Sequence, residues 1–143
     1  MRTSVSLIAL VALFGCNEPP GSPVVAISPA EPTTLDGLTA SITQDAVDPN
    51  GNDTVTYTWS WTRDGAAVAE VTGPDVPAEL TKRGETWTVT VVPADDKEQG
   101  EAAQASITIG NAVPSAEVEI TPDAPLSTDD LIAEITSSDP DGD

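Results

Sequence analysis

Apolar and polar residues alternate one by one along much of residues 24–110, in short runs that end at turn-forming residues. The clearest run is TVTYTWSWTR, residues 54–63, which has Thr or Ser at every second position. The positions between them are Val55, Tyr57, Trp59 and Trp61. Because successive side chains of a β-strand point to opposite faces, this pattern predicts a half-buried strand with its aromatic rings in a core.

Two later runs, ETWTVTVVP (85–93) and AAQASITIG (102–110), alternate in the same way. The side chains expected to point inward from them are Trp87, Val89, Val91, Ala105, Ile107 and Ile109. Between the two runs, ADDKEQGE (94–101) predicts an acidic hairpin tip. The two runs therefore predict a second half-buried hairpin.

Residues 64–84, between the run at 54–63 and the run at 85–93, are less regular. Asp64-Gly65 is a preferred pair for a two-residue hairpin turn with positive φ. AAVAEV (66–71) predicts a weak strand, and TGPDVPAELTKRG (72–84) predicts an edge or a crossover because it holds two prolines. About seven strands with regular turns indicate an antiparallel two-sheet sandwich.

Part of the chain occurs twice. Residues 24–43 (VVAISPAEPTTLDGLTASIT) align without a gap to 117–136 (EVEITPDAPLSTDDLIAEIT), at an offset of 93. The identical pairs are Val25/Val118, Ile27/Ile120, Pro29/Pro122, Pro32/Pro125, Asp36/Asp129, Leu38/Leu131, Ala40/Ala133, Ile42/Ile135 and Thr43/Thr136. The turn DPNGND (48–53) returns as DPDGD (139–143). A period of this length suits an immunoglobulin-sized module and is too long for a solenoid repeat.

These patterns predict an all-β chain with one complete Ig-like sandwich and a second copy represented by its first two strands. The predicted divisions are a signal peptide (1–15), a lipidated cysteine with a Pro-rich tether (16–23), the Ig-like domain (24–110), a linker (111–114) and the truncated repeat (115–143).

The first residues, MRTSVSLIALVALFGC, resemble a bacterial lipoprotein signal, with Cys16 as the residue that takes the lipid. The apolar run is too short to span a bilayer as a helix. An ordinary secretory signal with an accidental cysteine is the alternative. Cys16 is the only cysteine in the chain and so has no disulfide partner. We therefore expect acyl chains such as palmitate on Cys16, which would anchor the protein in the bacterial envelope, at the outer membrane or cell surface.

Composition narrows the chemistry that the chain can perform. The formal net charge is −19, from 24 acidic and 5 basic residues, and there is no histidine. Such a charge argues against nucleic acid as a partner. Without histidine, Ser-His-Asp triads, Cys–His dyads and His-ligated zinc are excluded. Trp59, Trp61 and Trp87 could stack on a sugar if exposed, but their spacing favours a core. We expect no enzymatic activity from these residues.

Oxygen donors in the first turn suggest a calcium site. The candidate ligands are Asp48, Asn50, Asn52 and Asp53, which surround Gly51. The turn is not an EF-hand loop, and turn chemistry alone also accounts for Asp, Asn, Pro and Gly at these positions. Further candidates are Asp139, Asp141 and Asp143 in the second copy, and Asp95, Asp96 and Glu98 in the hairpin tip. Apart from this calcium, no cofactor is expected.

DPNGNDTVTYTWSWTRDG (48–65) resembles the first half of PKD and related Ig-like modules of bacterial surface proteins. WTVTVVPADDKEQGEAAQASITIGN (87–111) resembles the last two strands of such modules. The resemblance implies spacers, adhesion units or appendages of secreted enzymes. We therefore expect a stalk, scaffold or adhesion lipoprotein. The alternatives are a calcium-dependent module that binds glycans or an extracellular protein, and a region that presents a catalytic part elsewhere.

Overall fold

A computed structural model describes residues 17–51 and 54–142. The signal peptide, Cys16, Asn52, Asp53 and Asp143 lie outside these described residues. Within them the chain is all-β, with no α-helix. The elements are β1 (Val24–Ser28), β2 (Leu38–Gln44), β3 (Thr56–Arg63), β4 (Ala66–Ala67), β5 (Asp75–Val76), a 3₁₀ turn η1 (Ala78–Leu80), β6 (Thr86–Ala94), β7 (Ala103–Thr108), β8 (Ser115–Thr121) and β9 (Ile132–Ser138).

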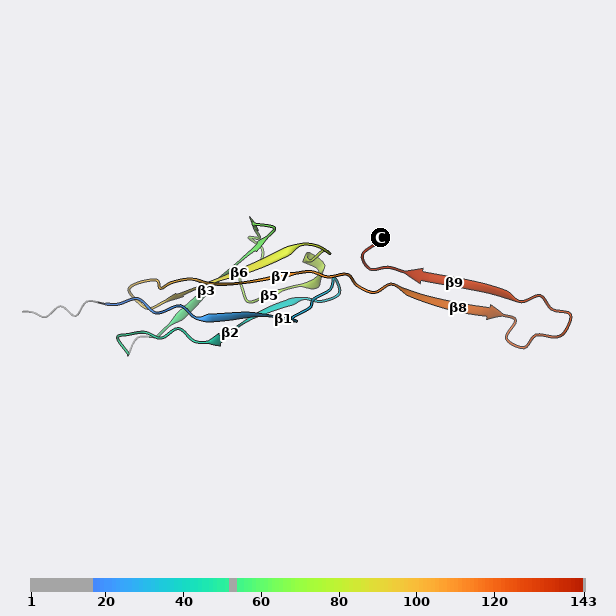
Figure 1. The fold of residues 1–143 in the computed structure, drawn as a ribbon, viewed down its shortest axis with the longest axis horizontal. Coiled ribbons are helices and arrows are strands. Elements are labelled where there is room, and N and C mark those ends of the chain that lie inside the picture. Colours follow the sequence, from blue (N-terminus) through green and yellow to red (C-terminus); the bar gives the residue numbers. More distant parts are fainter. Residues whose placement is uncertain (1–16, 52–53, 143) are drawn as a thin grey trace, which may run out of the picture.

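The strands form three antiparallel sheets (Figure 1). One sheet has the order β1-β2-β5 and a second has the order β4-β3-β6-β7. Buried side chains from both sheets form a single core cluster, so the two sheets face each other, as in a β-sandwich. The third sheet is the hairpin β8-β9, which extends away from the other two along the long axis of the molecule.

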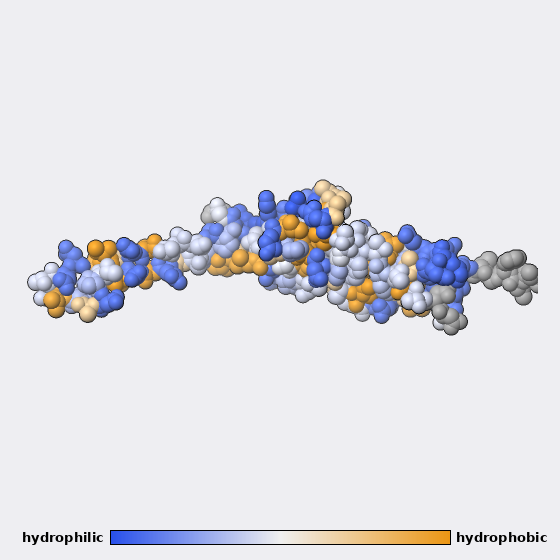
Figure 2. Space-filling model, turned by 180° about the vertical axis from the view of Figure 1, so that it is seen from behind, coloured by the Kyte–Doolittle hydropathy of each residue, from blue (hydrophilic) through white to orange (hydrophobic). Residues whose placement is uncertain are grey.

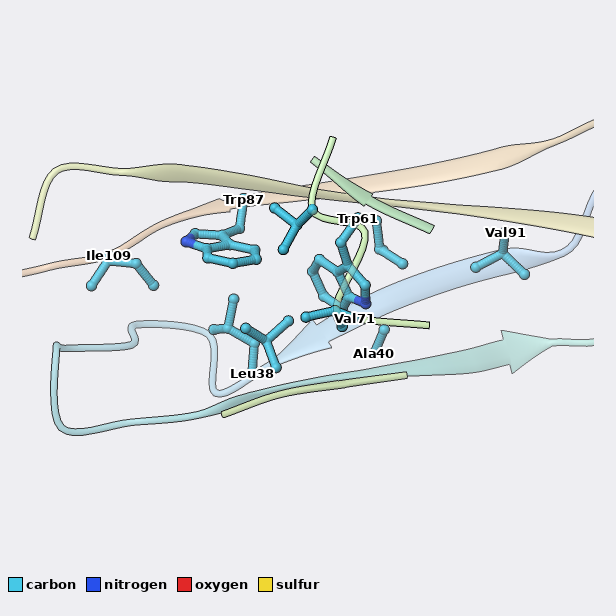
Figure 3. Packing of buried hydrophobic residues seen from close by; sticks show 10 residues of the cluster. Leu38, Ala40, Trp61, Val71, Trp87, Val91 and Ile109 are labelled. Atoms are coloured by element: carbon cyan, nitrogen blue, oxygen red, sulfur yellow. The ribbon is translucent and has the colours of Figure 1, made fainter. Parts of the chain in front are cut away.

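The predicted inward faces are confirmed. Trp61 and Trp87 are 1% and 0% exposed, and Val89 and Val91 are completely buried beside them. Figure 3 shows both indole rings directed from their sheet toward the opposite strand, which carries Leu38 and Ala40. The third tryptophan, Trp59, is only half-buried and packs against the core from its edge. Two rings, not three, therefore form the centre of the core.

The segment after β3 departs in part from its predicted form. The turn is as expected, with Asp64 at φ 49° and Gly65 at φ 82°. Only Ala66–Ala67 of the predicted strand 66–71 pair with β3. Val68 and Val71 leave the ladder but stay buried, and the Trp61 indole N–H donates to the Gly73 carbonyl over 2.9 Å. Side-chain packing and this hydrogen bond replace the regular strand pairing here.

Residues 17–23, expected as a semi-rigid spacer, lie against the module. Pro20 and Pro23 are buried, and the Gly21 N–H donates to the Val47 carbonyl over 2.9 Å. The backbone of Pro20 passes so close to Gly100 that a Cβ on Gly100 would stand 2.0 Å from the Pro20 oxygen. The described part of the predicted tether is therefore packed on the module.

The hairpin β8-β9 repeats the register of β1-β2. Val118 pairs with Ile135 and Ile120 with Ala133, at the positions where Val25 pairs with Ile42 and Ile27 with Ala40. The loops match as well: the Thr33 N–H donates to Asp36 Oδ2 over 2.8 Å, and the Leu126 N–H donates to Asp129 Oδ2 over 2.7 Å. The sequence repeat is thus also a repeat of backbone pairing.

The apolar side chains of this hairpin are exposed. Leu38 of β2 is 1% exposed, whereas its counterpart Leu131 is 62% exposed. Val118, Ile120 and Ile135 are also exposed, and Figure 2 shows hydrophobic side chains along the hairpin. The difference arises because β1-β2 faces the sheet β4-β3-β6-β7, while no sheet of the described residues covers β8-β9.

Candidate functional site

The first Asp-Pro-x-Gly turn (48–51) is held by hydrogen bonds to the carboxylate and the backbone carbonyl of Asp48. The Asn50 N–H donates to Asp48 Oδ1 over 2.7 Å, and the Gly51 N–H donates to the Asp48 carbonyl over 3.2 Å. Gly51 adopts a φ of 76°, which favours glycine at this position. The hydrogen bonding and the positive φ that Asp, Asn and Gly favour in turns are therefore both present here.

The side chain of Asn50 points to the segment that leads into the module. Its Oδ1 accepts the backbone N–H of Glu18 over 3.0 Å. Two of the four predicted calcium ligands, Asp48 and Asn50, therefore each accept a hydrogen bond from a backbone N–H group through one oxygen. The partial positive charge of these N–H groups would repel a cation close to those oxygens. The other oxygen of Asp48, Oδ2, is buried without a hydrogen-bond partner among the described residues. The remaining candidates, Asn52 and Asp53, lie outside those residues.

The acidic hairpin tip between β6 and β7 lies at the same end of the module. Asp95 Oδ1 accepts the N–H groups of Lys97 and Glu98 over 2.7 and 2.6 Å, and Asp95 Oδ2 accepts the Asn17 amide over 3.0 Å. Asn17 precedes the residue that contacts Asn50, so tip and turn meet the same segment. The hydrogen bond from Asn17, followed by those from the two backbone N–H groups, lowers the pKa of Asp95 to about 2.

The second Asp-Pro-x-Gly turn (139–142) shares with the first the hydrogen bond from the x residue to the leading aspartate, but its glycine donates to the carboxylate and not to the carbonyl. The N–H groups of Asp141 and Gly142 donate to Asp139 Oδ1 over 2.9 and 3.3 Å, and Gly142 has a φ of 74°. Asp141 Oδ2 accepts the backbone N–H of Ala112 over 2.6 Å. Asp141 Oδ1 accepts the hydroxyl of Thr34 in the first module. These bonds, of which that from Thr34 has the largest effect, lower the pKa of Asp141.

The carboxylates that were predicted as metal ligands do not gather into one cluster. Within residues 17–51 and 54–142, no three Asp, Glu or Cys side chains come together in an arrangement that could hold a metal ion. Asp48 and Asp139 accept hydrogen bonds within their own turns. Asp95 also accepts one from Asn17, and Asp141 accepts two from Ala112 and Thr34.

The described surface has hollows, two of which lie beside residues of interest. One, of about 670 Å³, lies beside β7 and is lined by Ala30, Glu31, Pro32, Thr33, Thr86, Ser106, Ile107, Thr108, Gly110 and Asn111. The other, of about 540 Å³, lies where the second turn meets the first module and is lined by Thr34, Ala78, Glu79, Thr81, Lys82, Arg83, Pro140 and Asp141. The second hollow holds both members of the adjacent basic pair Lys82-Arg83.

Among the described residues, every pKa value that departs clearly from normal is lowered. Asp36, Asp95 and Asp141 all have lowered pKa values, each mainly because hydrogen-bond donors stabilise the carboxylate. A general acid requires the opposite, a raised pKa. These three carboxylates are therefore suited to hold segments of backbone together.

Sequence reasoning did not identify Asn17, Asn111, Thr34 or Arg83 as contact residues. Asn17 contacts the tip of its module, and Asn111 accepts a hydrogen bond of 2.6 Å from Arg83 Nη1. Asn17 and Asn111 both lie shortly before the first strand of a repeat unit. The two asparagines are 94 positions apart, so a repeat alignment extended back with a gap of one residue is the signal that could have found them.

No protein-family model, curated protein or solved structure matches this chain at the significance required. None of the described residues belongs to a helix that is long and apolar enough to cross a membrane.

Proposed function

We propose that the chain is a non-enzymatic envelope lipoprotein whose tandem Ig-like, PKD-like modules act as a surface stalk, scaffold or adhesion unit. The observation that carries this proposal is the repeated hairpin: β8-β9 has the strand register and loop bonds of β1-β2. A module that recurs end to end gives length and spacing, which is what a stalk or scaffold requires.

The strand arrangement supports the Ig-like part of the proposal. Sheets β1-β2-β5 and β4-β3-β6-β7 enclose one core, and β4 extends the sheet of β3, β6 and β7. Variable-type Ig domains extend the corresponding sheet with an additional strand in the same way. The PKD-like part rests on the DPNG turn, the Tyr-x-Trp strand and the Asp64-Gly65 turn.

The lipid anchor rests on the sequence around Cys16. A body with a net charge of −19 is repelled by an anionic membrane surface, so it would need acyl chains to remain there. The protein is then attached to the membrane through the lipid on Cys16, and its modules face outward toward extracellular protein or glycan.

Lipidation is tested by producing the full chain in a bacterium that is fed labelled palmitate. We expect the label on the wild-type protein in the membrane fraction, and an unlabelled, soluble protein for Cys16→Ser. The control is Ser115→Cys in the Cys16→Ser background, which restores a thiol at another place and should not restore labelling. A wild-type protein that is soluble and unlabelled would exclude the anchor.

A calcium-binding module is the second candidate, and one specific observation favours it. Asp48 Oδ2 is a buried carboxylate oxygen that no described group satisfies, and buried carboxylates need a partner. Calcium accepts ligands of this kind at turns. In that case calcium would bind at this turn and support binding of a glycan or protein.

A further inference from the structure

Each Asp-Pro-x-Gly turn accepts a hydrogen bond from the backbone that leads into its own repeat unit. In the first unit, Asn50 Oδ1 accepts the N–H of Glu18. In the second, Asp141 Oδ2 accepts the N–H of Ala112. Asn50 and Asp141 both occupy the x position of the turn. The same contact thus occurs twice, at places far apart in the chain.

The second turn also contacts the preceding module. The hydroxyl of Thr34, in the loop between β1 and β2, donates to Asp141 Oδ1. Beside it, Arg83 Nη1 donates to Asn111 Oδ1 over 2.6 Å, and the Arg83 charge favours the ionised form of Asp141. Linker and turn are therefore both attached to one end of the first module. Figure 1 shows the C-terminal end folded back to this junction.

The distribution of charge favours this contact. After residue 16 the chain has four basic residues, and two of them are the adjacent pair Lys82-Arg83 at this end of the module. The turn that meets the pair contains Asp139 and Asp141. The opposite end of the module presents the first turn and the acidic tip between β6 and β7. Modules that stack in sequence order therefore place an acidic turn on a basic pair.

The residue at the x position differs between the two turns. Asn50, with a neutral amide, accepts the backbone N–H of Glu18. Asp141 accepts the backbone N–H of Ala112, and the nearby charge of Arg83 stabilises its carboxylate. The carboxylate thus occurs in the turn that lies beside a basic residue of the preceding module.

We propose that the x residue of the Asp-Pro-x-Gly turn makes the joint between successive modules rigid. It binds each module to the segment before it and, through Thr34 and the Lys82-Arg83 pair, to the end of the preceding module. The partner of this basic module end is a following copy of the module, held head to tail. The inference rests on the proposed tandem array and adds that its joints are rigid.

The test is amide hydrogen exchange, followed by NMR on the full chain. In Asp141→Ala we expect the Ala112 amide to exchange about tenfold faster, because its charge-assisted hydrogen bond is lost. The Glu18 amide should keep its rate. Asn50→Ala should have the reverse effect, accelerating Glu18 and leaving Ala112 unchanged. The matched control is Asp130→Ala, which removes an exposed carboxylate from the loop between β8 and β9 and should alter neither amide.

Two further readouts separate a lost joint from a lost fold. Protection of the Val89 and Val91 amides should persist in every variant, and ¹⁵N relaxation should show β8-β9 tumbling together with residues 24–110 in the wild type and independently in Asp141→Ala. The proposal is overturned if the wild-type hairpin tumbles independently, or if Asp141→Ala leaves Ala112 exchange unchanged. Neither result bears on labelling at Cys16, so failure of the joint and failure of the lipoprotein proposal are distinguishable.

Discussion

Trp61 and Trp87 meet edge to face in the core, with ring centroids 6.2 Å apart and ring planes at 70°. Trp61 lies on β3 and Trp87 on the neighbouring strand β6. Each indole N–H has an acceptor: Gly73 carbonyl for Trp61 and Glu85 Oε2, at 3.1 Å, for Trp87. The pair therefore combines full burial with satisfied polar atoms, which makes it the centre of the folded module.

Replacing either ring should strongly destabilise the module. We expect Trp61→Ala and Trp87→Ala each to lower the free energy of unfolding by about 3–5 kcal/mol, because a large buried side chain leaves a cavity. Trp59→Ala should cost less, since Trp59 is half-buried. Urea denaturation followed by far-UV circular dichroism measures all three. An equal loss for Trp59 and Trp61 would contradict the packing described here.

Gly100 should not tolerate a side chain. A Cβ at this position would clash with the Pro20 backbone, so Gly100→Ala must displace residues 17–21 or the hairpin tip. We expect a loss of about 1–3 kcal/mol in urea denaturation, as for other overpacked positions. Gly73→Ala is the matched control, because a Cβ added to Gly73 would meet nothing within 4 Å and the φ of Gly73 is not positive. The prediction fails if both variants unfold at the same urea concentration.

The contact between Asp95 and Asn17 should be sensitive to acid. The folded-state pKa of Asp95 is about 2, below its usual value of 3.8, so its ionised form stabilises the fold above that usual value. This contribution should disappear as the pH falls from about 4 to about 2. Melting temperatures of wild type and Asp95→Asn should therefore differ at pH 6 and converge near pH 2.

Asp96→Asn removes the same formal charge from the same tip and is the control for net charge. A difference between wild type and Asp95→Asn that stays constant from pH 6 to pH 2 would show that hydrogen bonding to the ionised Asp95 does not stabilise the fold.

A negative charge at position 50, the x position of the first turn, should lower the stability of the fold. Asn50→Asp adds a carboxylate next to the backbone of Glu18, itself an acidic residue, and we expect a loss of stability of about 0.2–1 kcal/mol, as for exposed charge pairs in general. Glu18→Gln in the same background should recover most of it. A double-mutant cycle by thermal unfolding at low salt measures this coupling. A coupling energy of zero would show that Glu18 does not select against a carboxylate at position 50.

Calcium distinguishes the two proposed functions. A stalk without a metal site predicts the same melting temperature with and without millimolar calcium. A calcium site predicts a rise that saturates with concentration and is absent in Asp48→Ala. Asp123→Ala, which removes an exposed carboxylate far from the turn in sequence, serves as the control. A calcium-dependent rise in wild type and Asp123→Ala, with none in Asp48→Ala, would replace the stalk proposal by the second candidate.

Alternation in the sequence was sufficient to predict most of the strands. Val89, Val91 and Ile109 are buried as the two-residue period indicates, because one face of a paired strand must leave water. The turn at Asp64-Gly65 could also be predicted, since few residue pairs accept positive φ at both positions. The repeat predicted two strands in residues 115–143, and the structure has β8 and β9 there, with the register of β1-β2.

The extent of the short strands β4 and β5 could not be predicted in this way. Val68 and Val71 continue an apolar pattern, but they are buried by folding over the core and not by strand pairing. Sequence periodicity cannot distinguish these two routes to burial. Likewise, the prolines of 17–23 indicate an extended segment and do not show that the glycine at position 100 leaves room for it.

The sequence by itself determined the strand faces and the turn types, which follow from residues close together in the chain. It also determined the repeat and the excess of acidic residues, which can be read without knowing any contact. Only the tertiary structure decided what the acidic turns contact. Asn50 lies 32 residues from Glu18, and Asp141 lies 107 residues from Thr34. Such contacts depend on how two sheets and a hairpin pack, because hydrogen-bond donors for a carboxylate can come from any part of the chain that packing brings within reach.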